Sequence, residues 1–188
     1  RDLIVTGVQT CALPICVEEL EAVTIIDVLR RGGIEVTSAS LTDSLTVQGS
    51  RGVSLLADAA WSSLDLAGFD ALVLPGGGKG TENLSADPRV TDAVVAFNEA
   101  EKYVAAICAA PTVLARAGIL NGRRATCYPT CAEQLGPAYD DAAPVIADGN
   151  VITSQGPGTA MLFSLVLVQH FAGDETVQRV AEGLLTSF

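Results

Sequence analysis

The sequence predicts an α/β protein whose mostly parallel sheet is covered by helices on both faces. Short apolar runs of strand length alternate with segments of helical periodicity almost throughout the 188 residues. Parallel strands need crossover connections, which helices usually supply, so this alternation favours a parallel sheet. The length suits one well-cored domain and is short for two, and we expect a single domain over residues 1–188.

Residues 1–16 stand apart from this pattern. Propensity alone allows a strand at Leu3–Val8. The segment also resembles the translated read-through of a sequencing adapter, and our hypothesis is that it has replaced a native first strand, with authentic sequence from about Val17 onward. A continuous genomic reading frame through these codons would contradict the hypothesis. We assign no function to Cys11 or Cys16.

The first predicted helix begins at Glu18 and ends at Gly32-Gly33. Acidic residues occupy its first turn and two arginines its last, as the helix dipole favours. Its apolar residues are close to helical spacing: Leu20, Val23, Ile26, Val28 and Leu29. A strand over Ile34–Ser40 and a short strand or hairpin arm over Val53–Leu56 follow.

The middle of the chain repeats the order of strand, turn and helix. A buried strand over Asp70–Leu74 ends in a proline and a run of glycines, and a long helix follows over about Pro88–Glu101. The apolar run from Tyr103 to Ile107 ends at Cys108 and leads into a helix that runs to about Ala117.

The last third is predicted to hold one more strand, a hairpin and two long helices. The strand is Arg124–Tyr128, and a short helix at Cys131–Leu135 follows it. Two apolar arms joined by Asp-Gly-Asn predict a hairpin over Val145–Ser154. The helices are expected at Thr159–Phe171 and Asp174–Leu185.

Charge and composition narrow the function classes. The formal net charge is −11, which argues against nucleic acid or an anionic membrane as a partner, because both are bound by clusters of Lys and Arg. No apolar run reaches the roughly 18 residues of a membrane-spanning helix, and no secretory pattern opens the chain. Five cysteines at irregular spacing suggest reduced thiols in a cytoplasm.

Cys108 is the leading candidate for a reactive residue. A strand delivers it to the edge of the sheet, small residues flank it, and a helix starts just after it, which is the layout of a nucleophile turn. The free backbone N–H groups at a helix start favour thiolate over thiol. A buried structural cysteine is an equally good interpretation of this stretch alone, because free cysteines are among the most buried residues.

The glycine run at Gly76–Gly78 lacks the spacing of either common phosphate-binding motif. Its backbone N–H groups could instead approach a reacting centre and stabilise an oxyanion, whereas the plainer interpretation is a tight turn. In an open parallel sheet this turn, Cys108 and the loop near Gly156 all fall at the carboxyl edge, where ligands bind. This convergence favours a site.

Four motifs in these turns resemble the ThiJ/PfpI superfamily, in its DJ-one branch: residues 74–78, 105–111, 125–129 and 153–159. The match covers Glu18 to about Leu185 in consistent order. The resemblance implies a flavodoxin-like three-layer sandwich of the class I glutamine amidotransferase-like kind, usually a homodimer. It also implies that Cys108 pairs with Glu21 from the first helix.

The pairing is chemically reasonable by itself. A carboxyl that burial keeps protonated can donate a hydrogen bond to a thiolate or to the oxygens of an oxidised cysteine. Oxidation of Cys108 to sulfinate then becomes an option, because thiolate character and access control that chemistry. The alternative for Glu21 is a solvated residue in the acidic first turn of a helix.

Two departures from the family pattern weaken peptidase and amidotransferase functions. Tyr128 stands where many glyoxalase members carry a histidine, and Ala109 stands where the protease-like branch has one. Tyr128 could donate a hydrogen bond but is a poor base. The only histidine, His170, is expected to be structural or at the surface.

Three further positions complete the site prediction. Arg51 matches an arginine that forms an anion-friendly patch near the dimer interface in some relatives, and Gln155 replaces its usual companion. Cys127 and Cys131 are four residues apart, but two ligands are too few for structural zinc. We expect no metal and no cofactor.

The function that the resemblance implies is cofactor-independent glyoxalase or deglycase chemistry on reactive dicarbonyls or their protein adducts. Cys108 would attack the aldehyde, Glu21 would move the proton, and backbone N–H groups near Gly76, Gly77 and Ala109 would hold the oxygen. The alternatives are a redox sensor or chaperone-like stress protein whose cysteine is oxidised to sulfinate, and a catalytically silent family member. We expect a cytoplasmic homodimer.

Overall fold

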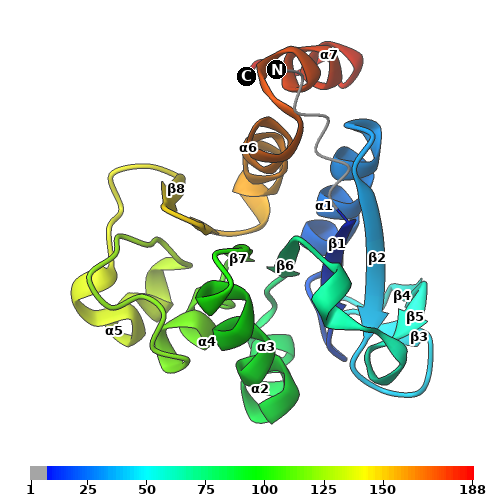
Figure 1. The fold of residues 1–188 in the computed structure, drawn as a ribbon, viewed down its shortest axis with the longest axis vertical. Coiled ribbons are helices and arrows are strands. Elements are labelled where there is room, and N and C mark those ends of the chain that lie inside the picture. Colours follow the sequence, from blue (N-terminus) through cyan, green and yellow to red (C-terminus); the bar gives the residue numbers. More distant parts are fainter. Residues whose placement is uncertain (1–7) are drawn as a thin grey trace.

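The computed structural model describes residues 8–188, and its centre is a seven-stranded sheet (Figure 1). The strand order is β5-β2-β1-β6-β7-β9-β8, in which only the β8–β9 pair is antiparallel. A separate hairpin joins β3 to β4. The strands are β1 (Val8–Leu13), β2 (Glu35–Ser40), β3 (Thr46–Gln48), β4 (Ser54–Leu56), β5 (Ala59–Ala60), β6 (Ala71–Leu74), β7 (Tyr103–Ile107), β8 (Val145–Asp148) and β9 (Val151–Ser154).

Helices cover both faces of the sheet, and the α/β sandwich expected from the sequence is confirmed. Helices α1, α6 and α7 pack on one face, and α2, α3, α4 and α5 lie on the other (Figure 1). Each face has its own apolar core. The helices are α1 (Glu19–Arg31), α2 (Gly78–Ala86), α3 (Pro88–Glu99), α4 (Pro111–Arg116), α5 (Ala132–Leu135), α6 (Ala160–Ala172) and α7 (Asp174–Gly183).

Most of the strand expected at Leu3–Val8 lies outside the described residues. Val8 is the only residue of the proposed Leu3–Val8 strand that lies within the described residues, and it opens β1. β1 occupies the middle of the sheet because it pairs in parallel with both β2 and β6. Cys11 and Leu13 then point into the core beneath α1 and α6.

The buried face of α1 differs from the face that its apolar spacing suggests. Leu20 and Val23 are about half exposed, whereas Glu19 and Glu21 are buried. Both carboxylates have partners in neighbouring loops, which is how a helix can bury charged side chains. The helix therefore buries two carboxylates at its start and leaves two apolar residues in solvent, while Ile25, Val28 and Leu29 pack in the core.

Two predictions about the region around the glycine and cysteine turns need correction. Helix α2 was not expected from the sequence, because its glycines and polar residues give no clear apolar period. Arg124–Tyr128 is not a strand: Ala125 forms a single bridge to Tyr139, and the backbone N–H of Thr126 donates to the side chain of Thr153 (2.9 Å). The segment crosses the end of the sheet instead of extending it.

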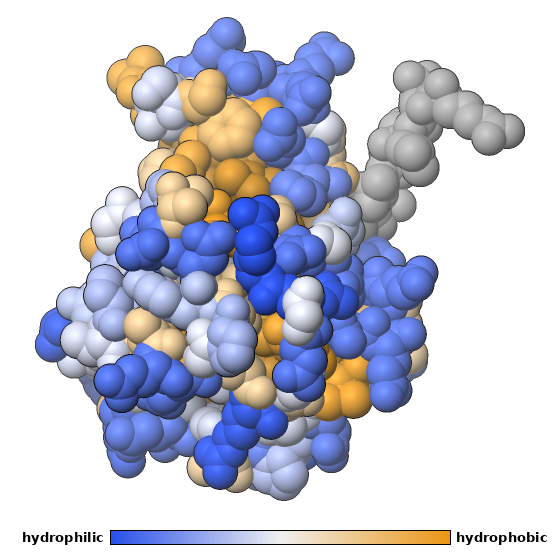
Figure 2. All heavy atoms as spheres, turned by 90° about the vertical axis from the view of Figure 1, so that its left-hand side faces the viewer, coloured by the Kyte–Doolittle hydropathy of each residue, from blue (hydrophilic) through white to orange (hydrophobic). Residues whose placement is uncertain are grey.

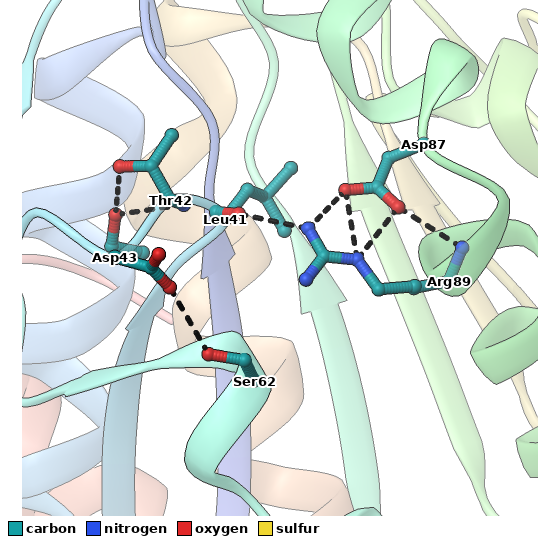
Figure 3. A network of polar contacts seen from close by, with 7 residues as sticks. Leu41, Thr42, Asp43, Ser62, Asp87 and Arg89 are labelled. Carbon is teal, nitrogen blue, oxygen red and sulfur yellow. Dashed lines mark hydrogen bonds and ion pairs between the residues drawn. The ribbon is translucent and has the colours of Figure 1, made fainter.

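The loop at the carboxyl end of β2 is braced by an arginine at the start of α3. Figure 3 shows Arg89 between Asp87, which caps α3, and the backbone of Leu41. Its guanidinium donates to both carboxylate oxygens of Asp87 and to the Leu41 carbonyl (2.9 Å), and Ser62 donates to Asp43 nearby (3.4 Å). This network fixes the rim of the sheet edge that carries the turns.

The face drawn in Figure 2 is largely hydrophilic. Figure 2 shows one face on which apolar side chains gather mainly in the upper part, at the level of α6 and α7, and at the lower right. Within residues 8–188 no helix combines the length and hydropathy needed to cross a membrane.

Candidate active site

Cys108 stands at the end of β7 in a strained backbone conformation. Its φ is 64°, a left-handed value that non-glycine residues seldom adopt and that is typical of a nucleophile turn. The Cys108 N–H donates to the Ser154 carbonyl (2.9 Å), and its carbonyl accepts from the Tyr128 N–H (2.8 Å). Two neighbouring segments thus hold the strained residue, which is 9% exposed.

Gly76 lies against the cysteine and leaves no room for a side chain. A Cβ on Gly76 would fall 2.6 Å from the Cys108 Cβ, 2.8 Å from the Ile107 carbonyl oxygen and 2.9 Å from Glu21 Oε2. The Gly76 N–H donates to Glu21 Oε2 (2.7 Å). Glycine is therefore required here, and its backbone joins the carboxyl of α1 to the turn after β7.

Glu21 is fully buried beside the cysteine. Burial raises the pKa of its carboxyl to about 7, although the hydrogen bond from Gly76 acts in the opposite direction. Its Oε1 has no N–H or O–H partner among the described residues. The Cys108 thiol, a hydrogen-bond partner of the Glu21 side chain, is the polar group that remains for it.

The pKa of Cys108 reflects opposing effects. Burial raises it to about 12, and the negative charge of Glu21 adds to the rise, while the backbone N–H groups of Gly77 and Ala109 lower it. The lowering expected from the backbone is thus present but smaller than the effect of burial. Because the repulsion vanishes once Glu21 holds a proton, the thiol and the carboxyl behave as a coupled pair.

The glycine turn also brings Gly77 close to the first segment of the chain. Gly77 has a φ of 98°, and a Cβ there would fall 2.7 Å from the Cys16 carbonyl oxygen. The Glu18 N–H donates to the Gly76 carbonyl (3.0 Å). The loop before α1 therefore forms one wall of the site.

The other predicted site residues lie around this centre in different ways. Tyr128 is 44% exposed, and its ring packs against Gly156. Gln155 is half-buried in the same loop, and its N–H donates to the Pro144 carbonyl (3.2 Å). Arg51 is exposed, and its side chain forms no hydrogen bond within residues 8–188.

Glu19 is a structural feature that sequence reasoning missed. It is 7% exposed and its carboxylate accepts from Ser50 Oγ (3.0 Å) and from the backbone N–H groups of Arg51 (2.7 Å) and Val53 (3.3 Å). Burial alone would raise its pKa, but these hydrogen bonds outweigh it, so the pKa is lowered. Glu19 thus fixes the turn that carries Arg51.

The remaining cysteines and the histidine have no comparable surroundings. Cys127 is fully buried, and burial raises its pKa to about 12, while Cys131 is half-buried. His170 is exposed on α6, with Nδ1 2.8 Å from the Val166 carbonyl and its ring edge-on to Tyr103. These contacts anchor the histidine at the surface.

A comparison of the whole sequence with known families agrees with the geometry of this turn. A model of the DJ-1/PfpI family matches residues 12–170. The chain belongs to the DJ-1/PfpI family.

Relatives within the DJ-1/PfpI family match nearly the whole chain. The protein dj-1beta of Drosophila melanogaster is 43% identical over 173 residues, which cover 91% of this chain and 92% of the relative. The glutathione-independent glyoxalase DJR-1.2 of Caenorhabditis elegans is 34% identical over 170 residues, covering 89% of each. The crystal structure of Drosophila melanogaster DJ-1beta superposes with a TM-score of 0.94 at 41% identity, covering 97% of this chain and 99% of that one. The flavodoxin-like fold is thereby confirmed.

Proposed function

We propose that the protein is a cofactor-independent, cysteine-dependent glyoxalase or deglycase that acts on reactive dicarbonyls or their adducts. The observation that carries the proposal is the buried Glu21 carboxyl beside Cys108, with the N–H groups of Gly77 and Ala109 on the thiol. A family member that shares 34% of its sequence bears the name of a glutathione-independent glyoxalase, which supports this class of chemistry.

The geometry suggests how the reaction would proceed on methylglyoxal. Ionised Glu21 takes the thiol proton as the Cys108 sulfur bonds to the aldehyde carbon, and the Gly77 and Ala109 N–H groups hold the oxygen of the hemithioacetal. A carboxyl whose pKa is about 7 suits both directions of proton transfer at neutral pH.

The redox balance of the reaction is internal to the substrate. Glu21 would first return the thiol proton to the hemithioacetal oxygen and would then carry the aldehyde-carbon proton to the neighbouring carbon through an enediol. The hydroxyl proton of the first carbon passes to the oxygen of the second, so the first carbon is oxidised by two electrons and the second is reduced. Water then hydrolyses the resulting thioester, releasing a 2-hydroxy acid and the free thiol. No external oxidant or reductant takes part.

Turnover of methylglyoxal to lactate tests the proposal. We expect Cys108→Ala to abolish turnover and Glu21→Gln to lower it by at least about a hundredfold, as loss of a general acid–base group does. Cys11→Ala, a buried thiol in β1, is the matched control and should retain turnover. Activity that survives Cys108→Ala would reject the mechanism, and an inactive wild type would favour a silent member in which Tyr128 has replaced a needed histidine.

A redox sensor is the second candidate, and it is favoured by Glu21 Oε1, which accepts from no N–H or O–H group within the described residues. A protonated Glu21 could donate through this atom to an oxygen of Cys108 sulfinate. Mass spectrometry after mild peroxide would decide: selective gain of two oxygens at Cys108 with negligible dicarbonyl turnover indicates the sensor. Gain spread over all five cysteines would reject it.

A homodimer is part of the proposal because of an apolar surface on α1 and the β3–β4 hairpin. Leu20, Val23, Val53 and Leu56 are each about half exposed or more. Burying such a surface against a second copy would remove it from water. Light scattering should give twice the chain mass, and Val23→Glu should yield a monomer; a monomeric wild type would contradict the dimer.

We also infer a single domain and a cytoplasmic location. All five cysteines are unpaired, which suits a reducing compartment.

A further inference from the structure

A cavity of about 480 Å³ lies directly beside the nucleophile turn. It is enclosed by α2, α4 and α5, and Ala109, whose N–H acts on the Cys108 thiol, is part of its wall. Polar side chains of all three helices line it: Thr81, Glu82, Ser85, Thr112, Arg116 and Gln134. The cavity therefore begins at Ala109, the residue after Cys108, and runs along α4 to Arg116.

Arg116 gives this cavity its chemical character. It donates only to Ser85 Oγ (2.9 Å) and has no carboxylate partner within residues 8–188, unlike Arg89, which is paired with Asp87. The one acidic side chain in the cavity wall, Glu82, is paired with Lys79 (2.8 Å). A guanidinium with free donors beside hydroxyl and amide groups is suited to a carboxylate.

We propose that this cavity is a substrate subsite that binds the carboxylate of an α-oxoaldehyde or of its adduct through Arg116; the inference rests on the proposed function. Arg116 lies five residues after the start of α4 at Pro111, or about 8 Å along the helix, and helical side chains point back toward the N-terminus. An aldehyde at Cys108 with a tether of a few methylenes would reach the guanidinium.

The test compares ω-carboxylated α-oxoaldehydes, with tethers of two to five methylenes, with their methyl esters. We expect kcat/KM for the best acid to exceed that of its ester by about tenfold, chiefly through KM. Arg116→Gln should bring the ratio close to one. Arg179→Gln, on the exposed part of α7, removes the same charge from a protein of net charge −11 and should keep the ratio.

The outcomes separate this inference from the proposed function. Turnover of methylglyoxal together with an acid-to-ester ratio of one would overturn the subsite and leave the proposed function intact. If the wild type turns over none of the aldehydes, the proposed function fails. In that case, NMR measures the binding of 4-oxopentanoate and of its methyl ester to the Cys108→Ala variant. Tenfold tighter binding of the acid, which is lost when Arg116→Gln is added, supports the subsite. Equal binding of the acid and the ester overturns it.

Discussion

Two strands of the same sheet, β7 and β1, lie on either side of β6 and are equally buried, but they fit their surroundings very differently. Every residue of β7 from Val104 to Ile107 is apolar and fully buried. In β1, Gln9 and Thr10 are also fully buried, yet neither amide atom of Gln9 nor the hydroxyl of Thr10 has a partner within the described residues. Each buried polar group without a partner lowers the free energy of unfolding by about 1–3 kcal/mol. The side chains of β1 are therefore poorly adapted to the middle of the sheet.

The turns after the two strands also differ. Cys16 and Cys108 both have a φ of 64°. At Cys108 the strain presents a thiol to Glu21 and to backbone N–H groups. At Cys16 the N–H donates to the Gln48 carbonyl (2.7 Å) and the carbonyl packs against Gly77 and Gly80. Strain at Cys108 accompanies a candidate site, whereas at Cys16 it accompanies a closely packed turn before α1.

The largest expected effect on stability concerns the turn at Cys108 and the glycine packed against it. Gly76→Ala should cost about 3 kcal/mol of unfolding free energy, because the new Cβ meets backbone and Cβ atoms at 2.6–2.8 Å that cannot move aside. Gly78→Ala is the control, since nothing lies within 4 Å of its Cβ position. Denaturant unfolding measures both, and equal stabilities would show that the turn is less tightly packed than described.

The second prediction concerns the pH dependence of the same turn. Folding raises the Glu21 pKa from about 4.5 to about 7, so between these values the unfolded chain loses its proton while the folded one keeps it. Stability should therefore fall by about 3 kcal/mol as pH rises from 4.5 to 7, relative to Glu21→Gln. Parallel stability curves for the two proteins would contradict the raised pKa.

In β1 a substitution should stabilise the protein. Gln9→Leu fills a similar volume without burying an unpaired amide and should raise the unfolding free energy by about 2 kcal/mol. Thr153→Val, which removes a buried hydroxyl that does have a partner in Thr126, should lower it. If Gln9→Leu instead lowers the free energy of unfolding, the polar side chains of β1 fit the core better than their contacts indicate.

The smallest expected effect is at Cys16. Cys16→Gly should stabilise by about 1 kcal/mol, because glycine adopts a left-handed φ without the cost of a Cβ. Cys16→Ala keeps the Cβ and should show no gain. Thermal unfolding of the two variants side by side measures the difference, and a stabilised alanine variant would point to another cause.

The sequence predicted the elements whose periodicity and turn chemistry agree, such as Tyr103–Ile107 and the hairpin over Val145–Ser154. It also pointed to Cys108 and Glu21, through motifs that the fold brings together. It did not predict the burial of Glu19, because the hydrogen bonds that allow it come from a turn about 30 residues away. The sequence around Arg116 did not predict a binding role either, because that role depends on a cavity formed by three helices.

The pH dependence of kcat/KM for methylglyoxal tests the central claim most directly. A Glu21 carboxyl that is coupled to Cys108 should give the wild type an inflection near pH 7, and Glu21→Gln should lose this inflection together with most of the rate. An unchanged inflection in Glu21→Gln would contradict the account.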